Sequence, residues 1–150
     1  MIKDGIIALG DLEIVLCDAQ GRVKEHRLEK NLVVNVGLAF IAQRMASTPT
    51  VMSHMAVGTG GTAAAAANTV LGTEVARVAL TSASNTTTTV TNDSMQYVAT
   101  FPAGTATAAL TEAAILNAAS AGTMLSRTVF AVVNKGASDA MTITWTIKVA

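Results

Sequence analysis

The chain has 150 residues, of which 51% are hydrophobic and 13% are charged, and ten basic residues balance ten acidic ones. This length suits one domain over residues 1–150, and the hydrophobic fraction excludes a long disordered chain. The zero net charge argues against a polybasic nucleic-acid binder. The single cysteine, Cys17, excludes an intrachain disulfide, and no run approaches the ~18 apolar residues of a membrane span. We therefore expect neither a nucleic-acid partner nor a membrane.

The charges are distributed unevenly along the chain. Residues 1–30 hold 11 of the 20 charged residues, and residues 46–73 hold none. A neutral surface with few charges promotes association, so we expect other chains, including further copies of this one, to cover much of it. The alternative is a β domain coated with Thr and Ser that is soluble without charge.

The N-terminal part is expected to begin with a flexible or docking arm over residues 1–10. Its apolar run is too short for a secretory signal, which favours an intracellular protein or a particle assembled inside a cell. Residues 12–17 are predicted to form a strand, followed by a type I turn over residues 18–21. Residues 22–30 carry charge on both faces, which is typical of an edge strand or an extended arm.

One short helix is predicted over residues 36–46. Apolar residues recur there at helical spacing, and Asn35 is a suitable N-cap.

From Ser53 onward the pattern favours strands. They are expected at residues 78–80, 86–91, 95–101, 113–117, 127–134 and 141–149, with turns at 92–93 and 135–139. The segment 127–134 is apolar on both faces, as in a central strand. The last segment alternates strictly, with Trp145 and four aliphatic residues on one face. The chain is therefore predicted to be mainly β, a jelly-roll-like β-sandwich with one short α-helix.

A glycine-rich segment is the most conspicuous motif. Residues 58–63, Gly-Thr-Gly-Gly-Thr-Ala, match the G-x-G-x-x-A pattern of dinucleotide-binding loops. The required context is missing, because Glu74 comes too early to bind the ribose and no alternating strands and helices follow. A loop on a β scaffold is the simpler interpretation.

The sequence offers few candidate residues for a metal site or for catalysis. His26, His54 and Cys17 are too few for a metal site, and no nucleophile elbow is present. Glu112 and Arg127 are natural partners in a buried salt bridge because charges are scarce here. We therefore expect no catalytic residues, no cofactor and no metal.

Several segments resemble a pattern that recurs in structural proteins of tailed bacteriophages. They are residues 30–37 (KNLVVNVG), 56–60 (AVGTG), 110–117 (LTEAAILN), 122–130 (GTMLSRTVF), 133–135 (VNK) and 142–147 (TITWTI). Size and a single domain make the chain most similar to capsid decoration (cement) proteins. The resemblance implies a jelly-roll-like fold, a place on the outer capsid surface of a virion assembled in the host cytoplasm, and the major capsid protein as partner.

The contact residues expected from this interpretation lie in the charged segment. Arg22, Lys24 and Arg27 are the candidates for ion pairs with acidic groups on the major capsid protein. A tail, baseplate or fibre component that adheres to the host, with residues 58–62 as a tip loop, is the alternative. An enzyme would need converging carboxylates, and few are present.

Overall fold

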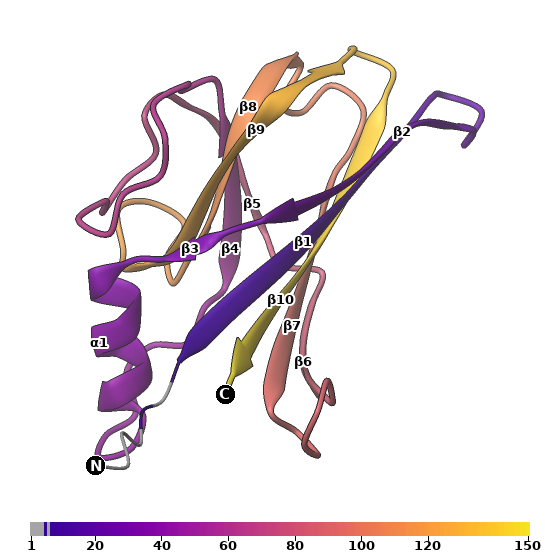
Figure 1. The fold of residues 1–150 in the computed structure, drawn as a ribbon. Helices are drawn as coiled ribbons and strands as arrows, with labels where there is room; N and C mark the ends of the chain where they lie inside the picture. The colour runs from indigo at the N-terminus through magenta and orange to yellow at the C-terminus, as the bar shows by residue number, and fades with distance from the viewer. Residues whose placement is uncertain (1–4, 6) are drawn as a thin grey trace.

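The structure is a computed structural model that describes residue 5 and residues 7–150. In this part of the chain two antiparallel sheets of five strands pack face to face (Figure 1). The first sheet has the spatial order β2 (Val23–Lys30), β1 (Ala8–Cys17), β10 (Ala140–Val149), β7 (Ser94–Phe101) and β6 (Ser82–Thr86). The second sheet has the order β3 (Leu32–Val33), β9 (Met124–Lys135), β8 (Ala108–Leu116), β4 (His54–Gly58) and β5 (Glu74–Ala79). The predicted β-sandwich is confirmed.

The core lies between the sheets and includes most of the residues that alternation assigned to inner faces. In β10 the buried row is Met141, Ile143, Trp145 and Ile147, whereas Val149 is 39% exposed. In β7, Tyr97, Ala99 and Phe101 are buried, and Pro102 follows the strand as predicted. The central strand β10 pairs with β1 over the whole length of both strands, from Ala8–Val149 to Cys17–Ala140.

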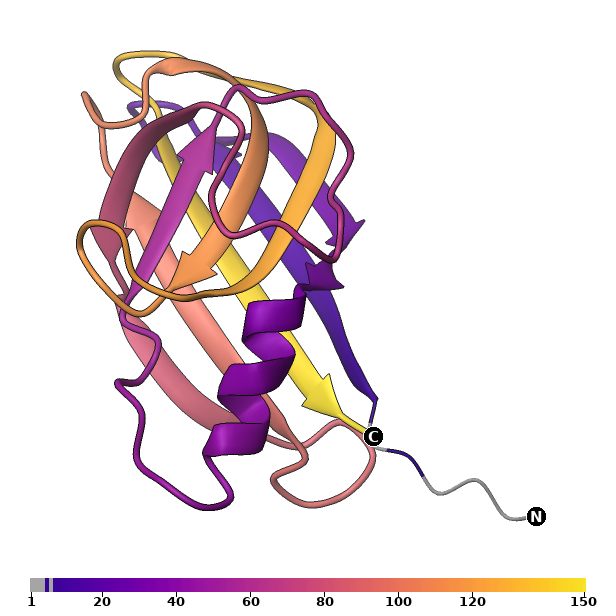
Figure 2. The ribbon, with the colours of Figure 1, turned by 90° about the vertical axis from the view of Figure 1, so that its left-hand side faces the viewer.

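The one helix among the described residues, α1 (Asn35–Gln43), lies beside the end of the second sheet and covers the lower half of the first (Figure 2). Phe40 is its buried anchor, and Gly37 allows close packing because a Cβ there would lie 2.0 Å from the carbonyl oxygen of Leu125. The predicted cap is wrong. Val34 is the N-cap without a side-chain cap bond, and the Asn35 N–H donates to the carbonyl of Ala66 instead.

Three other predictions, two of element boundaries and one of a strand's position in its sheet, differ from the structure. Residues 8–10 belong to β1, and Ile7 and Ala150 exchange two backbone hydrogen bonds, so an arm can include only earlier residues; residues 1–4 and 6 lie outside the described part. Strand β6 ends at Thr86, where the predicted strand 86–91 should begin. Strand β9 has only the two-residue β3 along its outer edge, so Val132 is 44% exposed rather than central.

The predicted strand at 86–91 is a loop because Asp93 binds its backbone. The Asp93 carboxylate accepts hydrogen bonds from the N–H groups of Thr88, Thr89 and Val90 at 2.9 Å each. Amides held by a side chain in this way are not available to a strand ladder. Hydrogen bonds from Val90 and its neighbours outweigh partial desolvation and hold the pKa of Asp93 well below its usual value.

Candidate functional site

The three predicted contact residues lie along or just before the edge strand β2, and each has a partner within the chain. Arg22 is paired with Asp18 at 2.7 Å, and its side chain remains 75% exposed. The Lys24 Nζ lies 2.6 Å from Asp139 Oδ2. Arg22 is therefore the member of the set most accessible to another molecule.

Arg27 links the two sheets. Its Nε donates to Glu25 at 2.7 Å, and its two terminal nitrogens donate to the carbonyl oxygens of Ala131 and Val132 at 3.2 Å each. These carbonyls lie on the outer edge of β9, beyond the short β3. Arg27 thus closes one side of the sandwich, a role that its sequence context did not indicate.

The Asp139 carboxylate, to which Lys24 is bound, also organises the turn before β10. Its pKa is held low by the Lys24 ammonium and the Gly136 N–H, against partial desolvation. Nearby, the buried Lys135 Nζ donates to the carbonyl oxygens of Asp139 and Pro102 at 2.6 and 3.0 Å. Burial lowers the pKa of Lys135, and Asp139 opposes that shift. Lys24 and Lys135 therefore both stabilise the turn before β10 within the chain.

The predicted Glu112–Arg127 salt bridge is confirmed and is the most buried ion pair of the described residues. Arg127 Nη2 and Nε lie 2.8 and 3.1 Å from Glu112 Oε2, and the side chains are 3% and 0% exposed. Glu112 is on β8 and Arg127 on β9. The pair lies between the second sheet and the loop of residues 59–73, which crosses in front of that sheet (Figure 2).

This loop, called loop 59–73 below, is fastened to the pair from both ends. The N–H groups of Gly60 and Thr73 donate to Glu112 Oε1 at 2.9 and 2.7 Å, and that of Gly72 donates to Oε2 at 2.9 Å. Arg127 in turn donates to the carbonyl oxygens of Thr62 and Ala63 and to the side chain of Asn68. Burial alone would raise the pKa of Glu112, but these donors outweigh burial and hold it below its ordinary value of 4.5.

The glycine motif is explained by this carboxylate. A Cβ on Gly58 or Gly60 would lie 2.6 or 2.5 Å from Glu112 Oε1, far inside van der Waals contact. The glycines therefore allow the backbone to approach an anion, as they do in a nucleotide-binding loop, but here the anion belongs to the chain itself. Within the motif the Gly60 amide donates to Glu112, a contact with a residue 52 positions away that the motif's own spacing could not predict.

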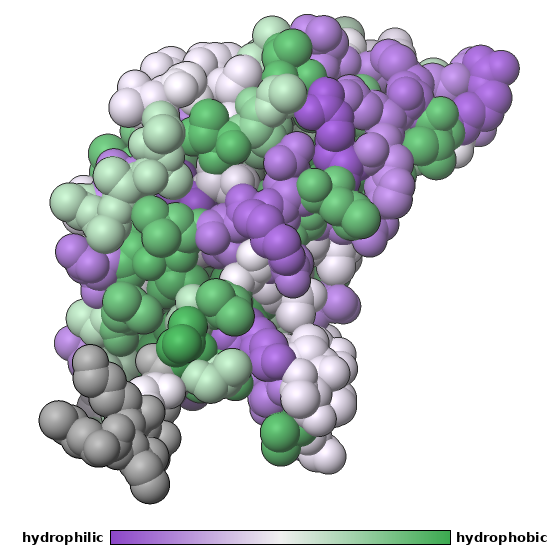
Figure 3. Space-filling model, in the orientation of Figure 1, coloured by the Kyte–Doolittle hydropathy of each residue, from purple (hydrophilic) through white to green (hydrophobic). Residues whose placement is uncertain are grey.

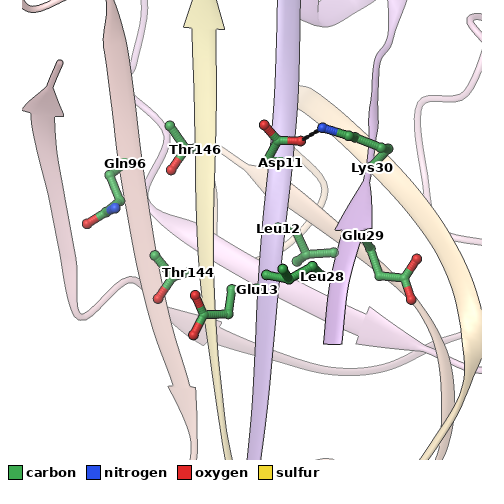
Figure 4. A pocket seen from close by; sticks show the side chains of 9 residues that line it. All are labelled: Asp11, Leu12, Glu13, Leu28, Glu29, Lys30, Gln96, Thr144 and Thr146. Carbon is green, nitrogen blue, oxygen red and sulfur yellow. Dashed lines mark hydrogen bonds and ion pairs between the residues drawn. The ribbon is translucent and has the colours of Figure 1, made fainter. Parts of the chain in front are cut away.

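A shallow cleft of about 510 Å³, called the polar cleft below because most of the side chains around it carry polar groups, lies on the outer face of the first sheet (Figure 4). Asp11 is paired with Lys30 across β1 and β2, and Glu13 lies 3.3 Å from His26. Side chains from four neighbouring strands line the cleft, among them Asp11, Glu13, Leu28, Gln96, Thr144 and Thr146. Among the residues that the structure describes, no three His, Cys, Asp or Glu side chains gather as a metal site would require.

An apolar strip is the other distinctive surface. Ile7, Leu9, Leu32 and Leu38 are 58%, 55%, 36% and 46% exposed. Ile7 directly precedes β1, Leu9 is in β1, Leu32 is in β3 and Leu38 is in α1, and hydrophobic side chains gather over these elements in the space-filling view (Figure 3). We call these four residues the aliphatic strip. In the described part of the chain no helix has the length and apolar character needed to cross a membrane.

Comparison with known proteins gives no further information: no protein-family model matches the chain, and no curated protein or solved structure matches it with significant similarity.

Proposed function

We propose that the protein is a capsid decoration protein of a tailed bacteriophage, which binds the outer surface of the major capsid protein lattice and stabilises the head. The segment resemblance motivates this proposal, and the β-sandwich is compatible with it. The observation that carries it is the aliphatic strip on a neutral domain. Four exposed aliphatic side chains from three separate elements favour burial against another protein surface.

The stabilising mechanism in this proposal is linkage. A ligand that binds the assembled lattice, and not its separated subunits, shifts the equilibrium toward the assembled state. Burial of the aliphatic strip supplies the non-directional part of the affinity, since apolar area contributes roughly 25 cal/mol per Å² removed from water. Arg22, the most exposed of the predicted contact residues, lies in the turn at the other end of the β1–β2 hairpin from Ile7 and Leu9, so it supplies an orienting charge where the capsid contact extends along that hairpin.

The test is decoration of expanded, undecorated heads, with bound copies counted after sedimentation. We expect saturation at a copy number comparable to that of the major capsid protein. Leu32→Asp and Leu38→Asp should each abolish most binding, because they place a charge in the contact. Val75→Asp is the matched control, since Val75 is 41% exposed on β5, at the opposite margin of the second sheet from β3. Absence of binding by the parent chain, or equal loss in the control, would contradict the proposal.

A second candidate function is adhesion to a host surface as a tail, baseplate or fibre component. The polar cleft favours it, because neighbouring carboxylate, amide and hydroxyl groups on one face can hydrogen-bond sugar hydroxyls (Figure 4). In that case Gln96→Ala and Thr144→Ala should reduce binding to host-surface glycans and leave head binding unchanged. A low copy number per virion would also favour this candidate.

A further inference from the structure

The four edges of the two sheets are protected to very different degrees. An unprotected edge strand exposes N–H and C=O groups that can pair with another strand, and proteins usually block it with charge, proline, bulges or covering elements. At the β2 edge of the first sheet five of eight residues are charged, and the pairing of β2 with β1 is interrupted between Leu16 and Cys17. This edge is blocked.

Both edges of the second sheet are blocked as well. On one side, Arg27 occupies two carbonyl oxygens of β9, and the Thr128 hydroxyl donates to the carbonyl of Lys30. On the other side, β5 carries the Glu74–Arg77 ion pair, and its register with β4 shifts between Val57 and Gly58. Each of these edges therefore has a device that discourages a further strand.

The β6 edge has none of these devices. Its sequence is Ser-Ala-Ser-Asn-Thr, and no charged residue or proline occurs from residue 78 to residue 92. Four of its five residues are exposed, its register with β7 is unbroken, and it lies at the free margin of the first sheet (Figure 1). Of the four edge strands, β6 is therefore the one whose backbone groups are available to pair with a strand from another chain.

We propose that β6 pairs antiparallel with β6 of a second copy, joining the two first sheets into one continuous sheet across a two-fold axis. In an isologous contact each side chain meets the same set of side chains from the other copy. Small neutral residues meet themselves without repulsion, whereas a charged or bulky strand would not. The neutral composition of β6 thus favours a second copy over a charged partner strand.

The geometry of β6 also defines the contact. Ser84 is paired with Gln96, which lines the outer cleft, and Ala83 with the buried Tyr97, so Ser84 faces outward and Ala83 faces the core side. With the axis at Ser84, Ala83 of each copy is opposite Asn85 of the other. Each second strand would then border the groove that Ala83 lines with Phe40, Met52, Tyr97 and Arg44, whose guanidinium donates to the carbonyl oxygen of Pro49. None of the four residues of the aliphatic strip lines this groove, so the contact goes beyond the proposed capsid binding and does not depend on it.

The test is the oligomeric state of the full chain by sedimentation velocity over a roughly hundredfold concentration range. We expect a reversible dimer of twice the 15.3 kDa chain mass. Ser84→Lys and Ser84→Glu should each raise the dimer Kd by about tenfold or more, because like charges meet at the axis. An equimolar mixture of the two variants should restore dimerisation. Thr100→Lys is the matched control, since Thr100 is exposed on β7 beyond the stretch of that strand that pairs with β6, and so lies outside the proposed contact.

A cross-link supplies an independent result. In a Cys17→Ser background, Ser84→Cys should form a disulfide-linked dimer under mild oxidation, and Thr100→Cys should not. A parent chain that stays monomeric at every concentration, with no cross-link at Ser84, overturns the proposal. A dimer that Ser84→Lys leaves unchanged overturns it equally, because the contact then lies elsewhere. Unchanged melting temperatures establish that the variants fold.

Discussion

Removal of the Glu112 carboxylate is the strongest test of how loop 59–73 is held. In Glu112→Ala, the Arg127 guanidinium keeps its hydrogen bonds to the loop but loses its counter-ion in a site where it is 3% exposed. Three backbone amides lose their acceptor at the same time. Breaking one partner of a buried pair typically costs about 3–5 kcal/mol. That is a large part of the ~5–15 kcal/mol by which domains are stable.

Glu74→Ala is the matched control. The Glu74–Arg77 pair is as short, at 2.7 Å, but Glu74 is 35% exposed and Arg77 keeps its bonds to the carbonyls of Ala118 and Ala121. An ion pair open to water on one side contributes about 0–1 kcal/mol. The two variants therefore remove the same chemical group from pairs that differ in burial and in the number of amide donors.

Two measurements separate the outcomes. Denaturant unfolding gives the free-energy difference, and limited digestion with a protease that cleaves after alanine reports release of loop 59–73. We expect Glu112→Ala to be cleaved there under native conditions and Glu74→Ala to resist. If Glu112→Ala loses no more stability than Glu74→Ala, the buried pair does not hold the loop.

The dependence of the free energy of unfolding on pH, measured at acidic pH, is a further test of Glu112. The folded pKa of Glu112 lies below its ordinary 4.5, so the unfolded chain takes up a proton first as the pH falls. The contribution of this carboxylate is therefore complete above about pH 4.5 and is lost as the pH drops through the lower folded pKa. Glu112→Ala should lack this part of the acid dependence.

Three other variants or titrations follow from the packing. Gly60→Ala should cost about 1–3 kcal/mol, because its Cβ would lie 2.5 Å from Glu112 Oε1, whereas Gly61→Ala, with nothing within 4 Å, should be neutral; equal melting temperatures for the two would refute the close approach. Trp145→Ala should cost about 3–5 kcal/mol, but Trp145→Phe much less, because the buried indole N–H has no hydrogen-bond partner to lose; chemical denaturation distinguishes them. Burial raises the pKa of Tyr97, the only tyrosine, to about 12, so stability should fall as the pH rises from about 10 through 12, and tyrosinate absorbance of the folded chain should be delayed to match.

The sequence predicted best those elements whose pattern is local. The alternation in residues 141–149 locates the strand and its buried face, because period two leaves only one way to orient it. The charges of residues 22–30 identify β2 as an edge strand, since a sandwich interior cannot accept charge on both faces. The Glu112–Arg127 pair was predictable from scarcity, because few other carboxylates and cations remain for a buried pair in that half of the chain.

What the sequence did not predict depends on contacts between distant segments. Strand β6 consists of residues with low strand propensity, and only pairing with β7 makes it a strand. Thr88 and Thr89 have high strand propensity, but their N–H groups donate to the Asp93 carboxylate instead of to a neighbouring strand. Loop 59–73 contacts Glu112 about 40 to 50 positions further on, which no local motif encodes.

The pairing of charged side chains within the chain determines which surfaces remain for contact with partners. Beyond residue 46 there are eight charged side chains, and each has a polar partner inside the chain; they are Glu74, Arg77, Asp93, Glu112, Arg127, Lys135, Asp139 and Lys148. Charge in this part of the molecule therefore holds loops and turns. The surfaces left over are aliphatic or coated with Thr, Ser and Ala, so contacts made through them depend on apolar burial and strand pairing, which salt does not screen. Attachment through the aliphatic strip or through β6 should thus persist at high ionic strength, and only a contact at Arg22 should weaken.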